Sequence, residues 1–358
     1  MGTASTGESE TWTEEDVMFV SGPTELSGIL TQPIEKSPHP AIVLLHGSER
    51  AGIDSTFYTE HSHNLVKSGH AVLRYDSPGV GRSTGSVIGE SLEDRTREAI
   101  SAVRYLQSRE DIVSEAVGLW GHSQGGWICQ MAAAEYDGVA FIIPVSGPGV
   151  TPAQQEVHRV EMQSRAAGFT EDEVAKAVLM RRLLVDIVLP EPMFKEANMD
   201  DARLIGSGPW DNVIEWLYHE KLEPESQFAK SIETLVAIKD ESWARFLFAE
   251  QILQMFEGLS PETWGNVKAS LGAVMTVDPE NFLTKVKVPV LAIFGEADAY
   301  LPVAKSVDLY RRYLGEAGNE EVAIRIFSDA DHAILVDGDP ASGYYDTIVE
   351  WLSRLALS

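Results

Sequence analysis

Ser123 has the local sequence of a nucleophile held in a sharp turn. It lies at the centre of residues 121–125 (Gly-His-Ser-Gln-Gly), between an apolar, strand-like run, Ala116–Trp120, and a segment with helical spacing, Gly126–Glu135. Glycines on both sides allow a tight, strained turn that holds a serine hydroxyl above a sheet and against the N-terminus of the next helix. The pattern also occurs by chance in plain turns, but the flanking strand and helix favour a nucleophile at Ser123.

Residues that could act as the acid and the base for this serine follow it along the chain. Asp298 comes just after the apolar run Val290–Phe294, and His332 comes just after the run Val322–Phe327. Because the carboxyl ends of parallel strands share one edge of a sheet, both side chains are expected beside Ser123. We predict that His332 takes the serine proton and that Asp298 orients and stabilises the imidazole.

Other carboxylates compete with Asp298 for this role. Glu296 lies two residues nearer the strand end, and Asp329 and Asp331 flank the histidine. Neighbours in sequence usually point their side chains elsewhere, and we expect both aspartates to be solvated. A plain surface histidine is the alternative for His332.

Two backbone amides are candidates for an oxyanion hole. The apolar run Ala41–Leu45 leads into residues 46–48 (His-Gly-Ser). We assign the two donors to the backbone N–H groups of Gln124, which follows the candidate nucleophile, and of Ser48. A plain turn is the alternative for the His-Gly pair.

These motifs together resemble those of bacterial α/β-hydrolases, most closely the esterase-like relatives of acyl-peptide hydrolases and dienelactone hydrolases. Residues 46–48, the turn around Ser123 and the Asp298/His332 pair carry the resemblance, with residues 74–83 (Arg-Tyr-Asp-Ser-Pro-Gly-Val-Gly-Arg-Ser). It covers about residues 41–147 and 288–356. Relatives often carry arginine where this chain has Pro78. The peptidase relatives also carry a β-propeller, but this sequence contains no repeat of the length of a propeller blade. Its absence argues against a peptidase activity.

The order of elements agrees with an α/β-hydrolase fold, a mostly parallel sheet with helices on both faces. An opening hairpin precedes strands and helices in alternation, and a sixth strand ends at Val145. The expected elements before it are strands at 17–20, 26–31, 41–45, 71–75 and 116–120 and helices near 57–67, 91–108 and 126–135.

The alternation stops after the sixth strand, where the chain becomes helical almost throughout. Thr151, Thr170 and Ser260 each have the sequence of a helix N-cap. We expect residues 1–148 and 282–358 to form the hydrolase core and residues 149–281 to form an α-helical cap over the active site. Most tryptophans and methionines of this cap are expected in its own core, and a minority in an apolar substrate pocket.

Two arginines in the expected cap have two interpretations. Arg181 and Arg182 could anchor an acidic substrate, but a solvated helix face is the interpretation we favour for them.

Composition excludes several classes of partner. The chain has 358 residues with 28 basic and 55 acidic side chains, a net charge of −27, which argues against nucleic-acid and anionic-membrane binding. Cys129 is the single cysteine, so no internal disulfide forms, and we expect a buried, inert thiol. No run is long and apolar enough for a membrane span, and residues 1–10 do not resemble a signal segment. A cytoplasmic protein is expected.

The sequence implies no cofactor and no metal. His61 and His63 are two residues apart, so on a helix their side chains diverge, and no acidic or cysteine cluster completes a metal site. Residues 79–83 (Gly-Val-Gly-Arg-Ser) lack the lysine and spacing of a phosphate-binding loop.

The expected activity is hydrolysis of a small-molecule ester through an acyl-enzyme on Ser123. Lactones, thioesters and amides use the same machinery, as does carbon–carbon bond hydrolysis of dienones. A ligand receptor of the same fold with slow turnover is the alternative outside enzymes, and a homodimer is left open.

Overall fold

The computed structural model describes residues 11–35, 37–49, 51–86 and 90–355. The expectation about residues 1–10 lies outside this range. The described chain forms two compact units. The first contains the chain up to Gly149, Pro279–Asp298 and the chain from Val303 onward, and the second contains Val150–Asp278 and Ala299–Pro302.

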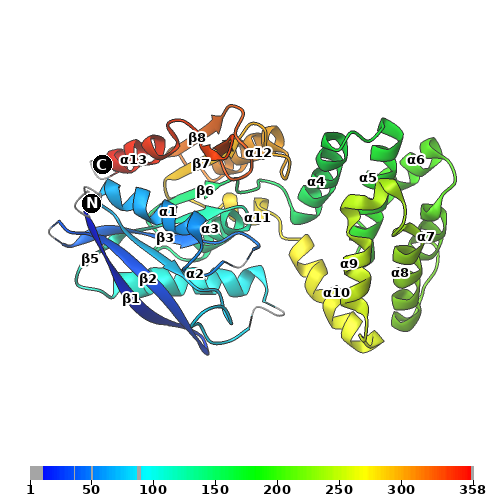
Figure 1. Ribbon diagram of the computed structural model, residues 1–358, viewed down its shortest axis with the longest axis horizontal. Coiled ribbons are helices and arrows are strands. Elements are labelled where there is room, and N and C mark those ends of the chain that lie inside the picture. The colour runs from blue at the N-terminus through cyan, green and yellow to red at the C-terminus, as the bar shows by residue number, and fades with distance from the viewer. Residues whose placement is uncertain (1–10, 36, 50, 87–89, 356–358) are drawn as a thin grey trace, which may run out of the picture. The chain divides into compact units, whose positions relative to one another are not determined.

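An eight-stranded sheet is the centre of the first unit (Figure 1). Its order is β1-β2-β4-β3-β5-β6-β7-β8, with β1, β2 and β4 paired antiparallel and all later pairs parallel. The α/β-hydrolase fold class and its opening hairpin are confirmed. The strands are β1 (Trp12–Ser21), β2 (Thr24–Pro33), β3 (His39–Leu45), β4 (Ala71–Tyr75), β5 (Ile112–His122), β6 (Ile142–Val145), β7 (Val290–Gly295) and β8 (Val322–Phe327).

Helices cover both faces of this sheet. Alternate side chains of the buried strands point to opposite faces, and on one face Ile42 and Trp120 pack with Tyr58 of α1 and Ile348 of α13. The helices of this unit are α1 (Thr56–Leu65), the 3₁₀ turn η1 (Val66–Ser68), α2 (Leu92–Gln107), α3 (Gln124–Glu135), α11 (Glu280–Leu283), α12 (Val303–Glu316) and α13 (Tyr344–Leu355).

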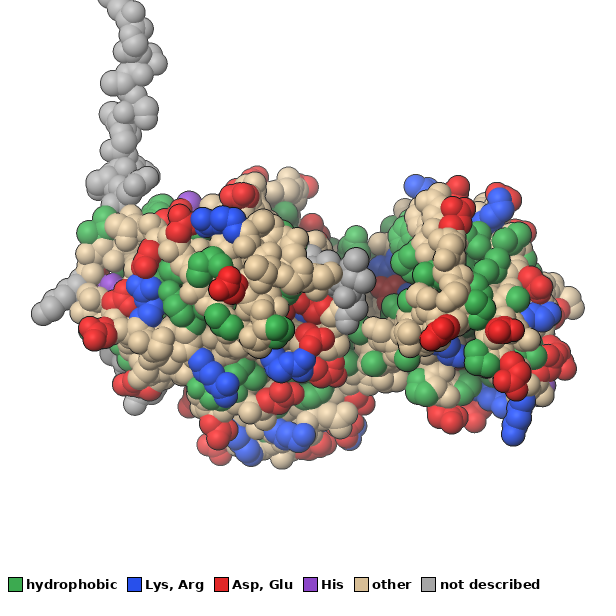
Figure 2. Space-filling model, turned by 90° about the horizontal axis from the view of Figure 1, so that it is seen from below, with side chains coloured by type: hydrophobic (Ala, Val, Ile, Leu, Met, Phe, Trp, Pro, Cys, Tyr) green, Lys and Arg blue, Asp and Glu red, His purple; other side chains and the backbone are tan. Residues whose placement is uncertain are grey.

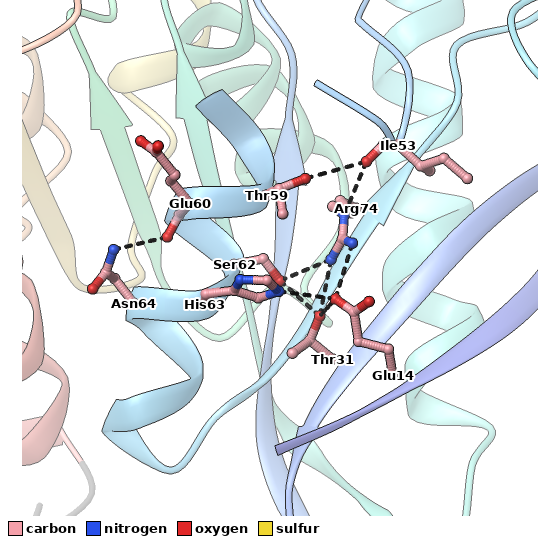
Figure 3. Close-up of polar contacts among 9 residues, drawn as sticks. All are labelled: Glu14, Thr31, Ile53, Thr59, Glu60, Ser62, His63, Asn64 and Arg74. Atoms are coloured by element: carbon pink, nitrogen blue, oxygen red, sulfur yellow. Dashed lines mark hydrogen bonds and ion pairs between the residues drawn. The ribbon is translucent and has the colours of Figure 1, made fainter. Parts of the chain in front are cut away.

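A buried arginine ties the edge of the sheet to the segment after β3 (Figure 3). Arg74 of β4 donates through Nε to the Ile53 carbonyl at 3.1 Å and through Nη1 to the Thr31 hydroxyl at 3.0 Å. Its Nη2 pairs with a Glu14 carboxylate oxygen at 2.9 Å, and Nη1 also reaches the Ser62 hydroxyl. Burial of this cation is tolerated because the guanidinium is surrounded by acceptors.

Asp76 fixes the loop that follows β4. One carboxylate oxygen accepts the Ile53 N–H at 2.8 Å, and the other accepts the Arg82 N–H at 3.1 Å. Gly81 adopts φ +54°, and any β-carbon there would overlap this carboxylate. Asp76 therefore holds the segment after β3 and the glycine-containing loop after β4 in fixed positions.

The second unit is helical. The N-caps predicted at Thr151, Thr170 and Ser260 are confirmed, because each side chain accepts an N–H from the first turn of its helix. Trp210, Trp216 and other large apolar residues form its core, as expected. Its helices are α4 (Pro152–Ala166), α5 (Glu171–Val188), α6 (Lys195–Ile205), α7 (Pro209–Tyr218), α8 (Pro224–Ile238), η2 (Ser242–Leu247), α9 (Ala249–Phe256) and α10 (Pro261–Met275).

Three elements near the C-terminal end have no counterpart in the sequence analysis. They are helices α12 and α13 and a short hairpin of β9 (Leu335–Val336) with β10 (Asp339–Pro340), which directly follows the His332 loop. Two-residue strands are too short to carry an alternating pattern.

Acidic side chains are spread over the face shown in Figure 2, with lysines and arginines among them and no separate basic patch. Within the described residues, no helix is long and apolar enough to cross a membrane.

Candidate active site

Ser123 lies at the tip of a strained turn between β5 and α3. Its φ is +54°, a conformation that costs a non-glycine residue about 1–3 kcal/mol and occurs mainly at functional sites. A β-carbon on Gly121 would overlap the Gly125 carbonyl oxygen, and one on Gly125 would overlap the Leu45 carbonyl oxygen. Both glycines are therefore required by close backbone contacts, which press the turn against the end of β3.

The structure brings His332 to both of its expected neighbours. Its Nε2 lies 2.9 Å from Ser123 Oγ, and its Nδ1 lies 2.7 Å from a carboxylate oxygen of Asp298. The Asp298 side chain is fully buried, whereas 16% of the His332 side chain is exposed. An ionised carboxylate only accepts hydrogen bonds, so Nδ1 carries the proton and Nε2 is left to accept the serine hydroxyl.

The competing carboxylates differ from the buried Asp298 in their exposure. Glu296, Asp329 and Asp331 are all exposed. Asp331 has a structural task instead, because its carboxylate accepts the backbone N–H groups of Ala333 at 2.8 Å and Leu335 at 2.9 Å. These bonds shape the loop on which His332 sits.

His122 is a further contact of this loop that the sequence analysis did not identify. Its Nε2 donates to the His332 backbone carbonyl at 3.0 Å. Burial, followed by the proximity of His332, lowers the pKa of His122 to about 4. The imidazole is therefore neutral at pH 7 and acts as a fixed hydrogen-bond donor between the β5 end and the His332 backbone.

The predicted oxyanion donors lie on adjoining segments. Gln124 is the first residue of α3, where a helix leaves its backbone N–H groups without internal acceptors. Ser48 lies in the loop after β3, and the Gly125 position in the turn is packed against the Leu45 and His46 carbonyls at the start of that loop.

Arg95 of α2 connects these two segments, and the sequence analysis missed it. The buried guanidinium donates to the His46 carbonyl at 2.7 Å, to the Gly47 carbonyl at 3.1 Å and to the side-chain oxygen of Gln124. Arg95 lies on the apolar face of its helix, three residues after Leu92, and a charge at such a position is the signal that could have identified it.

This contact fixes the direction of the Ser48 amide. The Gly47 carbonyl and the Ser48 N–H belong to one trans peptide plane, in which the two groups point in opposite directions. Arg95 holds the carbonyl, so the N–H is directed away from Arg95. The preceding peptide is held at both ends, because Arg95 binds the His46 carbonyl while the Gly47 N–H donates to the Tyr58 hydroxyl at 2.9 Å.

Glu49 completes the support of this loop. Its carboxylate accepts the Tyr58 hydroxyl and, at 3.2 Å, the Gly47 N–H. Partial burial acts to raise the pKa of Glu49, but the Tyr58 hydrogen bond and its other partners bring that pKa below the ordinary value. Glu49 is therefore an ionised acceptor at neutral pH.

Cys129 lies in α3, beneath the turn. Its thiol is buried, as expected, and burial raises its pKa well above the ordinary value. A buried thiol in this state is a poor nucleophile.

The described residues contain no group of three or more His, Cys, Asp or Glu side chains that could hold a metal ion. His61 contacts the Phe57 carbonyl at 2.8 Å, and His63 pairs with Glu14 at 3.1 Å.

The first unit also contains a cavity of about 600 Å³ that is separate from Ser123, Asp298 and His332. It lies between the β1–β2 turn and α2, lined by residues such as Thr24, Arg97 and Arg104. None of Ser123, Asp298 and His332 lines it.

Curated relatives match only part of this chain. Esterase EstD of Thermotoga maritima is 33% identical over 150 residues, which are 39% of this chain and 34% of that protein. An uncharacterised 31.7 kDa protein of Escherichia coli is 30% identical over 105 residues, 29% of this chain and 36% of that protein. The chain thus spans about a third of the length of the curated relatives it matches.

Solved structures of low sequence identity share the fold over nearly the whole chain. The α/β hydrolase GrgF from Penicillium has a TM-score of 0.58 at 17% identity, covering 97% of this chain and 100% of that one. Esterase Pf2001 of Pyrococcus furiosus has a TM-score of 0.56 at 15% identity, covering 99% and 95%. The model of the α/β hydrolase family matches residues 42–343, so this chain is a member of the α/β hydrolase family.

Proposed function

We propose that this protein is a serine esterase that cleaves carboxylic esters through an acyl-enzyme on Ser123. The observation that carries the proposal is the position of His332, with Nε2 2.9 Å from the Ser123 hydroxyl and Nδ1 2.7 Å from Asp298. These contacts are those required of a general base and of the acid that orients it. The relatives named as esterases support ester substrates.

In the proposed reaction, Ser123 Oγ bonds to the ester carbonyl carbon while its proton moves to His332 Nε2. The carbonyl oxygen becomes an oxyanion that accepts the backbone N–H groups of Ser48 and Gln124. Collapse of this intermediate breaks the bond to the alcohol, which leaves with the proton from His332. Water then attacks the acyl-enzyme and gives its proton to His332. Collapse of this second intermediate breaks the bond to Ser123 Oγ, which takes the proton back from His332 as the acid leaves.

The relationship within the family and the role of the helical unit are parts of the same proposal. Residues 74–83 favour the branch of acyl-peptide hydrolases and dienelactone hydrolases, and the contacts of Asp76 give that loop a structural task. We assign residues 149–281 the role of a cap that selects the substrate, because this stretch leaves the core after β6 as a helical unit with its own apolar core.

The direct experiment is hydrolysis of p-nitrophenyl esters from acetate to laurate by the wild type and by Ser123→Ala. Loss of a triad member typically lowers kcat by about 10⁴–10⁶-fold. Ser146→Ala is the matched control, because Ser146 also has positive φ (+47°) and also follows directly after a strand, β6. Equal turnover by wild type and Ser123→Ala would refute the proposal.

Two outcomes would point to the alternatives. Activity on a dienone with little on simple esters would favour carbon–carbon bond hydrolysis. A single burst of product followed by no further turnover would favour a ligand receptor.

A further inference from the structure

The helical unit contains an apolar cavity of about 210 Å³. Helices α5, α8, α9 and α10 form its walls, and all of its lining residues belong to the second unit. The apolar lining includes Val188, Leu235, Ile252, Phe256 and Trp264. Met255 also lines the cavity and is 56% exposed, which places one edge of the cavity at the surface of the unit. A pocket of this kind suits an alkyl chain.

One lining residue is a cation. Arg181 of α5 lies in the cavity wall with only 12% of its side chain exposed, so the expectation of a solvated helix face is wrong. Its neighbour Arg182 is also only 12% exposed and pairs with Asp201. Two adjacent arginines favoured a solvated face, but their partner carboxylates, Glu156 and Asp201, come from other helices and are not evident from the sequence.

The charge around Arg181 is only partly compensated. Its Nη2 donates to a Glu156 carboxylate oxygen at 2.6 Å, but Arg159 binds the same oxygen at 2.8 Å. One carboxylate thus serves two guanidinium groups. Arg181 Nε is buried and has no hydrogen-bond partner within the described part of the chain. Burial, opposed by Glu156, lowers the pKa of Arg181, but an arginine remains charged at neutral pH.

A buried donor without an acceptor is costly, and a buried excess charge more so. A ligand with a carboxylate would relieve both, because a carboxylate accepts two hydrogen bonds from a guanidinium side by side. The apolar walls would accept the remainder of the same ligand. A cavity of about 150 Å³ holds benzene, so this one accommodates a chain of about eight carbons.

We propose that this cavity binds a medium-chain carboxylate, with its alkyl chain among the apolar walls and its carboxylate on Arg181. The inference does not depend on ester hydrolysis, since every residue it uses lies in the helical unit and none belongs to the Ser123, Asp298 and His332 constellation.

The test is isothermal titration of octanoate into the full wild-type chain, since octanoate has no ester bond and is not turned over. Saturable binding of one octanoate per chain is expected, with octanol bound at least about 10-fold more weakly because a charged hydrogen bond is lost. No saturable binding up to about 10 mM octanoate, or equal binding of octanol, would overturn the proposal.

Variants locate the site. Arg181→Met is expected to weaken octanoate binding by about 10- to 100-fold. Arg182→Met is the matched control, because Arg182 is the adjacent arginine, is equally buried and does not line the cavity. Val188→Phe narrows the cavity without touching the charge and is expected to shift the preference from octanoate to hexanoate. Equal weakening by Arg182→Met, or an unchanged chain-length preference in Val188→Phe, would contradict this location.

Discussion

Replacing Arg95 by methionine tests whether side-chain contacts hold the loop after β3, which carries the proposed oxyanion donor Ser48. The change removes three hydrogen bonds, to the His46 carbonyl at 2.7 Å, the Gly47 carbonyl at 3.1 Å and the Gln124 side chain. Without the bond to the Gly47 carbonyl, that peptide plane is free to turn, and the Ser48 N–H turns with it. Loss of one oxyanion donor costs about 2.7–4 kcal/mol, a factor of about 10²–10³ in kcat.

The assay measures kcat and KM for p-nitrophenyl butyrate together with the inhibition constant of a boronic acid. A boronate on Ser123 mimics the tetrahedral intermediate, so its affinity should fall by the same factor as kcat. KM should change little, because the oxyanion forms only in the transition state. Arg95→Lys should recover part of the loss, since one ammonium group can reach a carbonyl but lacks the planar fork of donors.

Arg97→Met is the control for the same helix. Arg97 is 65% exposed and pairs only with Asp94 within the described contacts, so its loss should leave kcat unchanged. Removing Arg95 also leaves two buried carbonyls without their donor, so the free energy of unfolding should fall by about 2–5 kcal/mol. If Arg95→Met lowers stability but keeps wild-type kcat and boronate affinity, Arg95 has no part in positioning Ser48.

Two further predictions concern the acid of the triad and the buried histidines. Asp298→Asn should lower kcat about 10⁴-fold at pH 7, because His332 then adopts the wrong tautomer, whereas Glu296→Gln should leave kcat near wild type; a larger effect at Glu296 would reassign the acid. Burial lowers the pKa of His61, His70 and His122 to about 4. The unfolded chain therefore binds more protons than the folded chain between about pH 4 and 6.5, and stability should fall as pH falls through this range. Each histidine contributes a slope of up to about 1.4 kcal/mol per pH unit, measured by urea unfolding from pH 7 to 4.5, and His70→Gln should remove one such contribution. An unchanged slope in His70→Gln would show that His70 is not the source.

Much of the fold could be predicted because local patterns and tertiary structure agree. The opening hairpin, the parallel strands and the N-caps at Thr151 and Thr170 follow from alternation and capping chemistry, which depend on neighbouring residues. Ser123, Asp298 and His332 were predicted from the strand ends that they follow, and the structure brings them within hydrogen-bonding distance of one another through His332.

The remaining features depend on contacts between distant segments. Arg95 binds carbonyls 48 and 49 residues earlier in the chain, so no spacing rule reveals its partners. Arg181 was expected in solvent because two adjacent arginines are typical of a polar face, yet its acceptor is Glu156 on another helix. Two acceptors of Arg95 are backbone carbonyls, which every residue has, so the pattern of side chains does not reveal them.

The central claim is that Ser123 is the nucleophile, and a p-nitrophenyl alkylphosphonate tests it most directly. This reagent gives a stable tetrahedral adduct on an activated serine and releases p-nitrophenol as the adduct forms. We predict release of one equivalent per chain, loss of esterase activity in proportion, and the added mass on the peptide that contains Ser123. Labelling of another residue, or esterase activity that survives complete labelling of Ser123, would contradict the mechanism.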